Sequence, residues 1–501
     1  MRKPAKIDEK RIKEELDYWR VPGMAVAVIQ EGAPDQIICL GWRDVEKGLP
    51  VTPDTKFCIA SCSKSMTSAL IACLADEGRL DYDRPVREYV PHLRMKDEKA
   101  DAQMTLRDLL CHRTGLGGHD ALWPGTNTRE QLSRQIRYLQ PCAEFREKAL
   151  YSNLLYAMIG YIAEYVTGES WPQLMERYLF KPLGMSRTTC TAEQIESDRN
   201  HAEPYFVRKG QLNKVTFWNV DLAGPAASVN STPRDMAKWL SFHISGGKTA
   251  EGAQLISPEI FAEMHKPHIA YCDSAGLDED CYPCDTYCQG WLSGKYRGHS
   301  LQKHSGKIEG YSTLQVYLPE ERAGVVLMAN LHSPTTPVFY SVLYTILDQL
   351  LGYEDAHWEN RFHVTGEPVA PAALYEDMRI DVAAERLREN CREQPEGFSW
   401  SELIGIYENP GYGQVKVNLV SRENVNLVSR ENEQLMLFYR DQNLPLNHWG
   451  GSQYWIDDVK EDIWLMKIPL EFVDDGNGNA AAVKIGYEPM VKDIVFIKKM
   501  Q

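Results

Sequence analysis

The stretch Phe57–Ala75, FCIASCSKSMTSALIACLA, carries the features that decide the fold expected here. A short apolar run, KFCIA, ends at Ala60 and reads as a strand. The segment Ser65–Glu77 then shows helical spacing, with apolar side chains recurring on one face. The sequence therefore predicts a strand that leads into a buried helix, with a polar turn between them.

That polar turn places three serines, Ser61, Ser63 and Ser65, around Lys64. Residues three apart in a helix lie one turn apart on the same face, so Ser61 can contact Lys64 while Ser63 points elsewhere. A serine attacks only after a base takes its proton, and a lysine whose pKa is lowered by burial can be that base. The spacing predicts Ser61 as a nucleophile and Lys64 as its base; a plain polar helix start is the alternative.

Spacing alone does not single out this pair, because Ser-x-x-Lys occurs twice more in the chain. Ser245-Gly-Gly-Lys248 is predicted in a glycine-rich loop and Ser300-Leu-Gln-Lys303 before a strand. Only the stretch at Ser61 follows an apolar strand-like run and opens an apolar-faced helix.

A second motif, Tyr151-Ser-Asn153, opens an apolar helix predicted over Asn153–Thr167 and closed by Gly168. A tyrosine near a lysine can relay a proton. An asparagine amide can hydrogen-bond both a substrate carbonyl and the lysine. Tyr407-Glu-Asn409, in a different region, has the same spacing and reads as a strand end.

A third motif, His304-Ser-Gly306, is predicted at the start of an apolar strand. Its glycine lets a substrate approach the backbone closely. The backbone N–H groups of Ser61 and Lys307 are candidates for an oxyanion hole. His448-Trp-Gly450 has the same spacing near the C-terminus.

In this order the three motifs resemble those of the serine β-lactamase and penicillin-binding-protein superfamily, in the branch of class C β-lactamases, DD-peptidases, esterases and D-aminopeptidases. The resemblance spans about residues 15–350 and includes Leu106–Asp120 and Ala223–Leu240. It implies hydrolysis of an amide or ester through an acyl-enzyme on Ser61, without a metal or organic cofactor.

The resemblance also implies a role for each candidate residue. Lys64 and Tyr151 would move the proton, Asn153 would hold the acyl side chain, and the N–H groups of Ser61 and Lys307 would hold the oxyanion. His304 and Gly306 would bind substrate.

One position departs from the β-lactamase pattern, in which a lysine usually stands where this chain has His304. A histidine carries only partial charge near pH 7. This favours a peptidase, D-aminopeptidase or esterase of the S12 type, acting on a small-molecule or short-peptide substrate. A class C-like β-lactamase and a catalytically inactive sensor with the same fold stay open as alternatives.

The domain organisation follows from where the strand and helix patterns change. Residues 1–360 predict an α/β (α+β) sandwich, with a central antiparallel sheet flanked by helices and an all-helical lobe. Residues 361–400 read as a charged helical connector. Residues 401–501 form short alternating strands that predict an all-β barrel, which resembles the lipocalin-like C-terminal domain of some family members. A structural accessory that narrows access is favoured for it, with assembly into a homo-oligomer as the alternative.

Composition limits the partners. The 501 residues carry a net charge of −15, which excludes a general nucleic-acid or anionic-membrane binder. The start lacks the apolar region of a secretory signal and no run approaches a membrane span, so a cytoplasmic protein is expected. Twelve cysteines, mostly single in apolar contexts, fit a reducing compartment.

Two local features carry no assigned role. Four cysteines lie between Cys272 and Cys288, but a single C-x-x-C pair does not complete a zinc site, so a thiol-rich insertion is favoured over a metal. VNLVSREN at Val417–Asn424 is repeated at Val425–Asn432, and a lengthened hairpin is its favoured interpretation.

Overall fold

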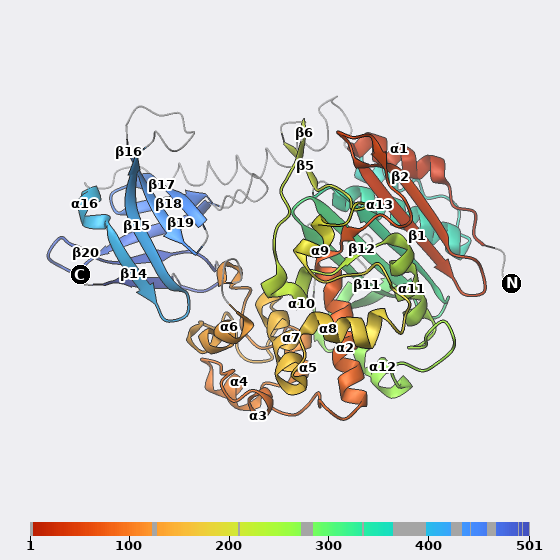
Figure 1. The fold of residues 1–501 in the computed structure, drawn as a ribbon, viewed down its shortest axis with the longest axis horizontal. Coiled ribbons are helices and arrows are strands. Elements are labelled where there is room, and N and C mark those ends of the chain that lie inside the picture. Colours follow the sequence, from red (N-terminus) through yellow and green to blue (C-terminus); the bar gives the residue numbers. More distant parts are fainter. Residues whose placement is uncertain are drawn as a thin grey trace.

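The structure is a computed structural model in which the chain forms a large N-terminal α/β part and a C-terminal β-barrel beside it (Figure 1). It describes residues 4–122, 128–208, 211–271, 284–332, 335–363, 397–421, 433–440, 442–457, 467–488, 490–492 and 494–499.

The N-terminal part is built on a nine-stranded antiparallel sheet in the order β3-β2-β1-β13-β12-β11-β10-β9-β8. Its strands are β1 Gly23–Gln30, β2 Gln36–Asp44, β3 Leu49–Pro50, β8 Ile269–Ala270, β9 Cys284–Tyr287, β10 Leu292–Tyr296, β11 His299–Ile308, β12 Tyr311–Leu318 and β13 Ala323–Ala329. Strands from the two ends of this region meet in the middle, where Met24 pairs with Ala329. Every residue of β1, β12 and β13 is buried, because helices cover both faces of the sheet.

Two short strand pairs lie outside this sheet. β4, Phe57–Cys58, pairs with β7, Asn230–Ser231, and β5, Tyr205–Arg208, pairs with β6, Gln211–Lys214. The apolar run KFCIA therefore holds only two strand residues before the chain turns toward Ser61.

Helices cover the sheet and build the predicted helical lobe. α1 Glu9–Trp19 and α13 Thr335–Leu351 pack together, and α11 Pro233–Ile244 contacts β1 and β13. The central helix is α2, Ser63–Asp76, buried from Ser63 to Leu74. The remaining helices are α3 Val86–Tyr89, α4 Glu98–Gln103, α5 Leu106–Leu110, α6 Arg129–Gln135, α7 Asn153–Thr167, α8 Trp171–Met175, α9 Ala192–Glu196, α10 Gly224–Ala227, α12 Pro258–His265, α14 Glu359–Phe362 and α16 Trp400–Leu403.

α7 has the bounds that the sequence predicts. The Ser152 side chain accepts a hydrogen bond from the Leu155 N–H at its start. Gly168 ends it in the left-handed conformation, with φ of 77°, which glycine adopts without strain. Local signals are sufficient at both ends, and they place Asn153 at the first turn of a buried helix.

The C-terminal part is a closed barrel of eight strands, which supports the predicted lipocalin-like domain. The strands are β14 Gly405–Asn409, β15 Gly413–Ser421, β16 Glu433–Tyr439, β17 Gln442–Gly450, β18 Gln453–Asp457, β19 Lys467–Asp474, β20 Ala480–Ile485 and β21 Ile494–Lys498. The sequence predicts all of these except β17, whose Pro445 and polar residues hide its strand pattern. Leu444 and Leu446 of that strand belong to the buried core.

Some of the sequence-based predictions fall on residues outside the described ranges. They concern most of the connector at 361–400, residues 422–432 of the repeat, and Cys272 and Cys281 of the cysteine cluster. Among the residues that the structure does describe, no group of three His, Cys, Asp or Glu side chains is arranged to hold a metal ion. Within the same ranges no helix is both long and apolar enough to cross a bilayer.

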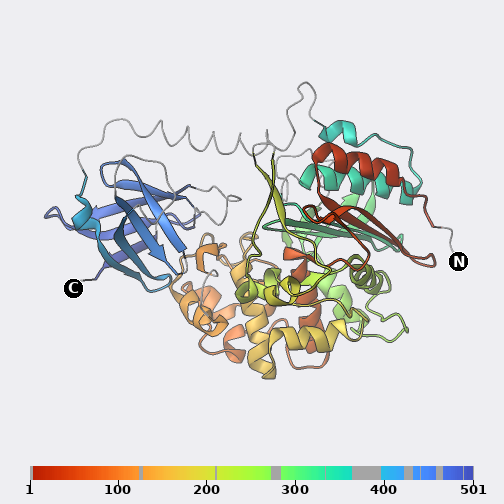
Figure 2. The ribbon, with the colours of Figure 1, turned by 45° about the horizontal axis from the view of Figure 1, so that its top comes forward.

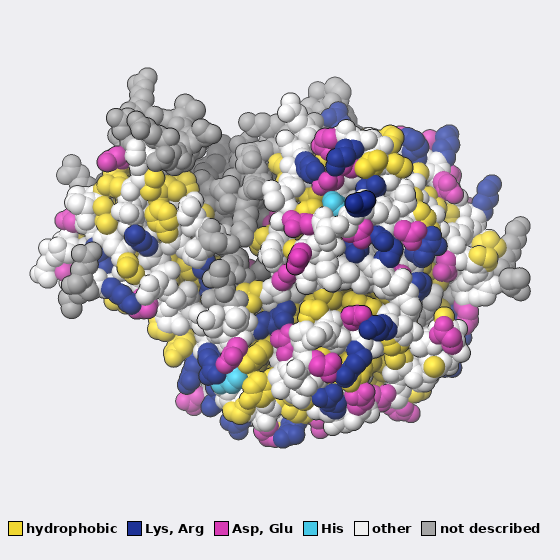
Figure 3. Space-filling view, in the orientation of Figure 1, with side chains coloured by type: hydrophobic (Ala, Val, Ile, Leu, Met, Phe, Trp, Pro, Cys, Tyr) yellow, Lys and Arg dark blue, Asp and Glu magenta, His cyan; other side chains and the backbone are white. Residues whose placement is uncertain are grey.

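Charges of both signs are mixed on one face of the N-terminal part. On the face drawn in Figure 3, Lys and Arg side chains are interspersed with Asp and Glu over the N-terminal part. The described residues on that face form no patch of one sign, as expected for a chain with a net charge of −15.

Candidate active site

A strained turn presents Ser61. Ala60 has φ of 46°, a left-handed conformation that non-glycine residues seldom adopt. It opens a short 3-10 helix, Ala60–Cys62, that runs directly into α2. Ser61 is partly exposed, whereas its neighbours on both sides are buried. The turn therefore directs the Ser61 hydroxyl outward from an otherwise closed helix start.

The other two serines of the turn make hydrogen bonds that hold the fold together. The Ser63 hydroxyl accepts a hydrogen bond of 3.0 Å from the Val229 N–H. The Ser65 hydroxyl donates to the Cys62 carbonyl and accepts from the Gln315 side chain, both at 2.8 Å. Ser63 and Ser65 are completely buried, so of the three serines only Ser61 combines exposure with contact to Lys64.

Lys64 is fully buried and its Nζ has three oxygen neighbours. They are Ser61 Oγ at 3.0 Å, Asn153 Oδ1 at 2.8 Å and the Ala226 carbonyl at 3.1 Å. The two carbonyl-type oxygens can only accept. A neutral amine has two N–H bonds, which these acceptors take, and its lone pair then faces the Ser61 hydroxyl.

The charge state of Lys64 suits this arrangement. Burial lowers the pKa of its ammonium from 10.5 to about 7, and the nearby Asp120 carboxylate opposes part of that fall. About half of the molecules then carry a neutral amine at pH 7. At neutral pH the buried Lys64 side chain therefore exists both as an ammonium and as a free amine that can accept a proton.

Tyr151 lies against both members of the pair. Lys64 Nζ is 4.5 Å from the centre of its ring. Burial raises the pKa of the Tyr151 phenol well above 10, and a hydrogen bond with Ser61 offsets only part of that rise. The phenol keeps its proton at neutral pH, so Lys64 rather than a tyrosinate is the group able to accept one.

Asn153 connects this centre to a carboxylate. Its Oδ1 accepts from Lys64 Nζ, and its Nδ2 donates to Asp120 Oδ1 at 3.3 Å. Asp120 is exposed and lies at the start of a 3-10 turn, Asp120–Leu122. In the sequence Asp120 only ends a family-like segment and receives no role, because nothing in its local pattern links it to α7.

A chain of hydrogen bonds sets the tautomer of His304. His112 Nδ1 accepts from the Ser152 N–H, so His112 Nε2 carries the proton that faces the Tyr287 hydroxyl at 3.2 Å. Tyr287 in turn donates to His304 Nε2 at 3.1 Å, and His304 Nδ1–H donates to the Ser305 carbonyl at 2.7 Å. Burial and the Lys64 charge lower the pKa of His304 to about 3. Sequence reasoning misses Tyr287, since it lies inside the Cys272–Cys288 cluster without a motif of its own.

The strand position predicted for His304 is wrong. His304 lies inside β11 rather than at the start of a strand, and Ser300-Leu-Gln-Lys303 lies within the same strand rather than before it. The first half of β11 pairs with β10. Its mostly polar residues, from His299 to Lys303, do not show the apolar pattern that predicts a strand.

Gly306 is where β11 meets the Ser61 turn. A Cβ at Gly306 would lie 2.2 Å from the Ile59 carbonyl and 2.9 Å from the Ser61 nitrogen. Only glycine permits this approach, which brings the backbone just before Lys307 beside the Ser61 N–H. Cys62 adds a contact from its thiol to the His304 carbonyl at 3.3 Å.

The other motif copies have hydrogen-bond partners elsewhere, and His448 of His448-Trp-Gly450 lies in β17 with its Nε2 3.0 Å from the Gly451 carbonyl. Ser245 Oγ donates to the Phe242 and Lys248 carbonyls and closes α11. Lys303 Nζ donates to the Tyr340 hydroxyl at 2.8 Å. Tyr407 donates to the Leu403 carbonyl inside the barrel. The structure therefore gathers Ser61, Lys64, Tyr151, Asn153, His304 and Gly306, with Lys307 next to Gly306.

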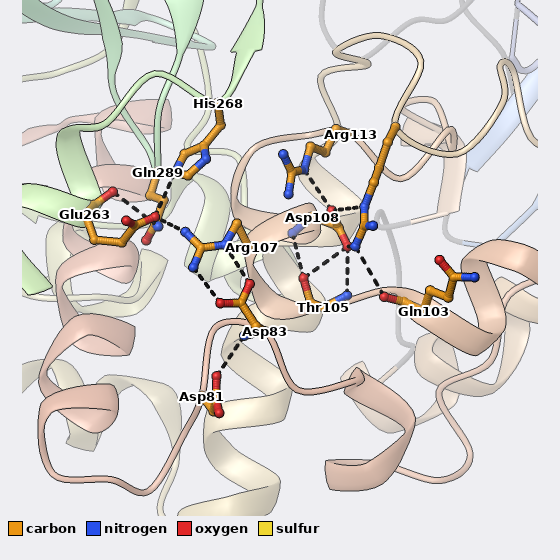
Figure 4. Close-up of polar contacts among 11 residues, drawn as sticks. Asp81, Asp83, Gln103, Thr105, Arg107, Asp108, Arg113, Glu263, His268 and Gln289 are labelled. Atoms are coloured by element: carbon orange, nitrogen blue, oxygen red, sulfur yellow. Dashed lines mark hydrogen bonds and ion pairs between the residues drawn. The ribbon is translucent and has the colours of Figure 1, made fainter.

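A buried charge cluster supports the segment that carries His112 and Asp120 (Figure 4). Asp108 is fully buried and accepts from Arg113 at 2.7 Å and from Arg146 at 2.8 Å. Hydrogen bonds from Arg146 and the Thr105 N–H, with the charge of Arg113, keep the pKa of Asp108 below its usual range despite burial. On the other side of α5, Arg107 bridges Asp83 and Glu263.

A small cavity lies between the strand that precedes the Ser61 turn and the end of β11. Its volume is about 20 Å³, and it is bordered by Cys58, which precedes the Ser61 turn, and by Ile308, which follows Gly306. Its walls include Phe217, Trp218 and Tyr311. A cavity of this size holds about one water molecule, so it does not define a substrate pocket.

The fold is that of the β-lactamase and penicillin-binding-protein type of domain. A family model described as Beta-lactamase matches residues 9–343, well over half of the chain, and the chain belongs to that family.

Two kinds of relative extend the comparison. The unguisins hydrolase ungD of Aspergillus violaceofuscus is 25% identical over 509 residues, covering 96% of this chain and 88% of that protein. An octameric penicillin-binding protein homologue from Pyrococcus abyssi superposes with a TM-score of 0.59 at 21% identity, over 97% of this chain and 98% of that one. The D-amino acid amidase of Ochrobactrum anthropi gives a TM-score of 0.55 at 24% identity, over 69% and 96%. The first two likenesses include the barrel, and the amidase matches the hydrolase fold.

Proposed function

We propose that this protein is a serine hydrolase that cleaves an amide or ester bond of a small or short-peptide substrate through an acyl-enzyme on Ser61. The observation that carries the proposal is the environment of Lys64 Nζ, which has two obligate acceptors and the Ser61 hydroxyl as its neighbours. Its lowered pKa supplies a free amine near neutral pH.

In the first half-reaction Lys64 takes the Ser61 proton while Oγ attacks the substrate carbonyl carbon. The resulting oxyanion is held by the N–H groups of Ser61 and Lys307. Collapse breaks the C–N or C–O bond, and the leaving group receives the proton from Lys64, with Tyr151 as the relay. In the second half-reaction water attacks the Ser61 ester, releases the acid and restores the hydroxyl. No cofactor takes part in these steps.

The charges around the site bear on the substrate. His304 is neutral in this arrangement, whereas Asp120 places a carboxylate next to Asn153. An anionic group on the substrate would meet the negative charge of Asp120 and a neutral imidazole at His304. This supports substrates that are neutral or cationic beside the scissile bond, as in peptidases, D-aminopeptidases and esterases of the S12 type, over a β-lactamase.

A catalytically inactive sensor is the other alternative from the sequence. A binding protein has no need to bury a lysine with its lone pair aimed at a serine, since burial of an ammonium costs several kcal/mol.

Free buried thiols such as those of Cys58, Cys62 and Cys111 fit the proposed cytoplasmic location. A homo-oligomer is proposed from the likeness to the octameric homologue.

Activity profiling tests the proposal. Wild type and Ser61→Ala are compared on D- and L-aminoacyl anilides, short p-nitrophenyl esters and nitrocefin. Turnover of anilides or esters that is lost in Ser61→Ala supports it. Turnover of nitrocefin alone would replace it with a β-lactamase, and activity that survives in Ser61→Ala would refute it.

A further inference from the structure

The barrel contacts the segment beside the candidate active site through two buried side chains. Tyr412 lies in the NPGYG turn between β14 and β15, and Glu488 lies in the turn after β20. Figure 2 shows the barrel lying against the helical lobe. Tyr412 is 3% exposed and Glu488 is 6% exposed, so both are covered by the lobe or by the barrel itself.

Both side chains converge on His119. The Glu488 carboxylate accepts from the His119 N–H at 2.8 Å. His119 Nε2 donates to the Gln140 carbonyl at 3.1 Å, so Nδ1 carries no proton and accepts from the Tyr412 hydroxyl at 2.6 Å. Burial lowers the pKa of His119, which favours this neutral form. His119 is thus held by one hydrogen bond inside the lobe and two from the barrel.

The chain around His119 is shaped to receive the barrel. His119 has φ of 47°, which a non-glycine residue adopts only when its surroundings hold it. A Cβ at Gly117 would lie 3.3 Å from the Glu488 carboxyl carbon and 2.6 Å from the Cys142 sulfur. On the barrel side, a Cβ at Gly411 would lie 3.0 Å from Leu139. Because the chain approaches closely on both sides, Gly117 and His119 of the lobe and Tyr412 and Glu488 of the barrel form one tightly packed contact, which we call the joint.

The residue after His119 is Asp120, which accepts from Asn153, and Asn153 accepts from Lys64. The link from Tyr412 and Glu488 to the proposed base therefore passes through His119, Asp120 and Asn153. We propose that Tyr412 and Glu488 are positioning residues: the barrel holds the His119–Asp120 segment so that the Asp120 carboxylate stays beside Asn153 and Lys64. The proposal rests on the proposed function only in its effect on catalysis.

The pH dependence offers a readout that a merely structural role would not move. The titratable groups around Lys64 are Cys62 in the turn before its helix, Tyr151 and Tyr156 from the α7 side, Asp120, and His112 and His304. Of these, Asp120 favours the charged lysine most, and Cys62 adds a smaller effect in the same direction. A loosened Asp120 therefore lowers the pKa of Lys64 and moves the acidic limb of the rate profile to lower pH.

The test compares Tyr412→Phe, which removes only the hydroxyl, with the control Tyr407→Phe. Tyr407 also donates one buried hydrogen bond, but to Leu403 within the barrel. Fluorophosphonate labelling of the full chain is measured from pH 5 to 10, in the wild-type and in the Asp120→Asn background. We expect Tyr412→Phe to move the acidic limb to lower pH and so to raise labelling below pH 6 by about threefold, to leave the plateau rate above pH 8 unchanged, and to have no further effect in Asp120→Asn.

A second measurement does not depend on catalysis. Hydrogen exchange followed by mass spectrometry reports the His119 amide in peptides from Gly115 to Leu122. Faster exchange in Tyr412→Phe and in Glu488→Ala than in Tyr407→Phe supports the joint even if Ser61→Ala disproves the hydrolase. Equal exchange and equal labelling in Tyr412→Phe and Tyr407→Phe would overturn the proposal.

Discussion

The rate of Ser61 acylation should follow the titration of Lys64. An ordinary lysine, with a pKa of 10.5, is neutral in about 0.03% of molecules at pH 7, whereas a pKa of about 7 makes about half of them neutral. Burial therefore supplies about a thousandfold more free amine at pH 7. Because the neutral form is the base, labelling should fall about tenfold per pH unit below pH 6 and level off above pH 8.

The assay is the second-order rate constant for labelling with a fluorophosphonate from pH 5 to 10. Burial lowers the pKa of His304 to about 3 and raises that of Tyr151 well above 10, so neither titrates in this window. A single midpoint near pH 7 is expected. Lys64→Arg, whose guanidinium stays charged, should lose about a thousandfold at pH 7. A midpoint near pH 10, or a Lys64→Arg variant with wild-type rates, would refute the reasoning.

Three further substitutions distinguish residues that act in the reaction from residues that stabilise the fold. Gly306→Ala places a methyl group 2.2 Å from the Ile59 carbonyl, so labelling should be lost and urea denaturation should show a loss of about 1–3 kcal/mol; unchanged rates would contradict the fitted approach. Ser63→Ala leaves the Val229 N–H unpaired and should cost about 1–3 kcal/mol of stability while the labelling rate per folded molecule is kept. Asp108→Ala removes the carboxylate that pairs with Arg113 and Arg146 and should lower the free energy of unfolding by about 3–5 kcal/mol at pH 7. Since folding lowers the pKa of Asp108, its stabilisation is present above the unfolded pKa near 4 and is lost as pH falls through the folded pKa, so wild type and variant should converge in acid.

Local sequence signals predict much of the hydrolase fold. The bounds of α7 follow from Ser152 and Gly168, and apolar runs fill β12 and β13, whose residues are all buried. The first half of β11 and the whole of β17 escape sequence-based prediction because polar residues and Pro445 occupy them. There, pairing with neighbouring strands overrides local preference.

The site shows the same division. Helical spacing predicts the Ser61–Lys64 pair, and the family resemblance implies that Tyr151 and Asn153 join it. In the fold the side chains of Ser61, Tyr151 and Asn153 lie around Lys64 Nζ. Asp120 and Tyr287 are missed as site residues, because each reaches the site through contacts with residues far away in the sequence. The tautomer of His304 depends on Tyr287 and its neutral state depends on burial, neither of which a motif encodes.

The central claim is that Ser61 forms the covalent intermediate. Intact-mass and peptide mass spectrometry after fluorophosphonate treatment tests it most directly, with Ser61→Ala and Ser63→Ala measured alongside. One adduct per chain is predicted, located on Ser61, present in Ser63→Ala and absent in Ser61→Ala. An adduct on another residue, or one that persists in Ser61→Ala, would contradict the account.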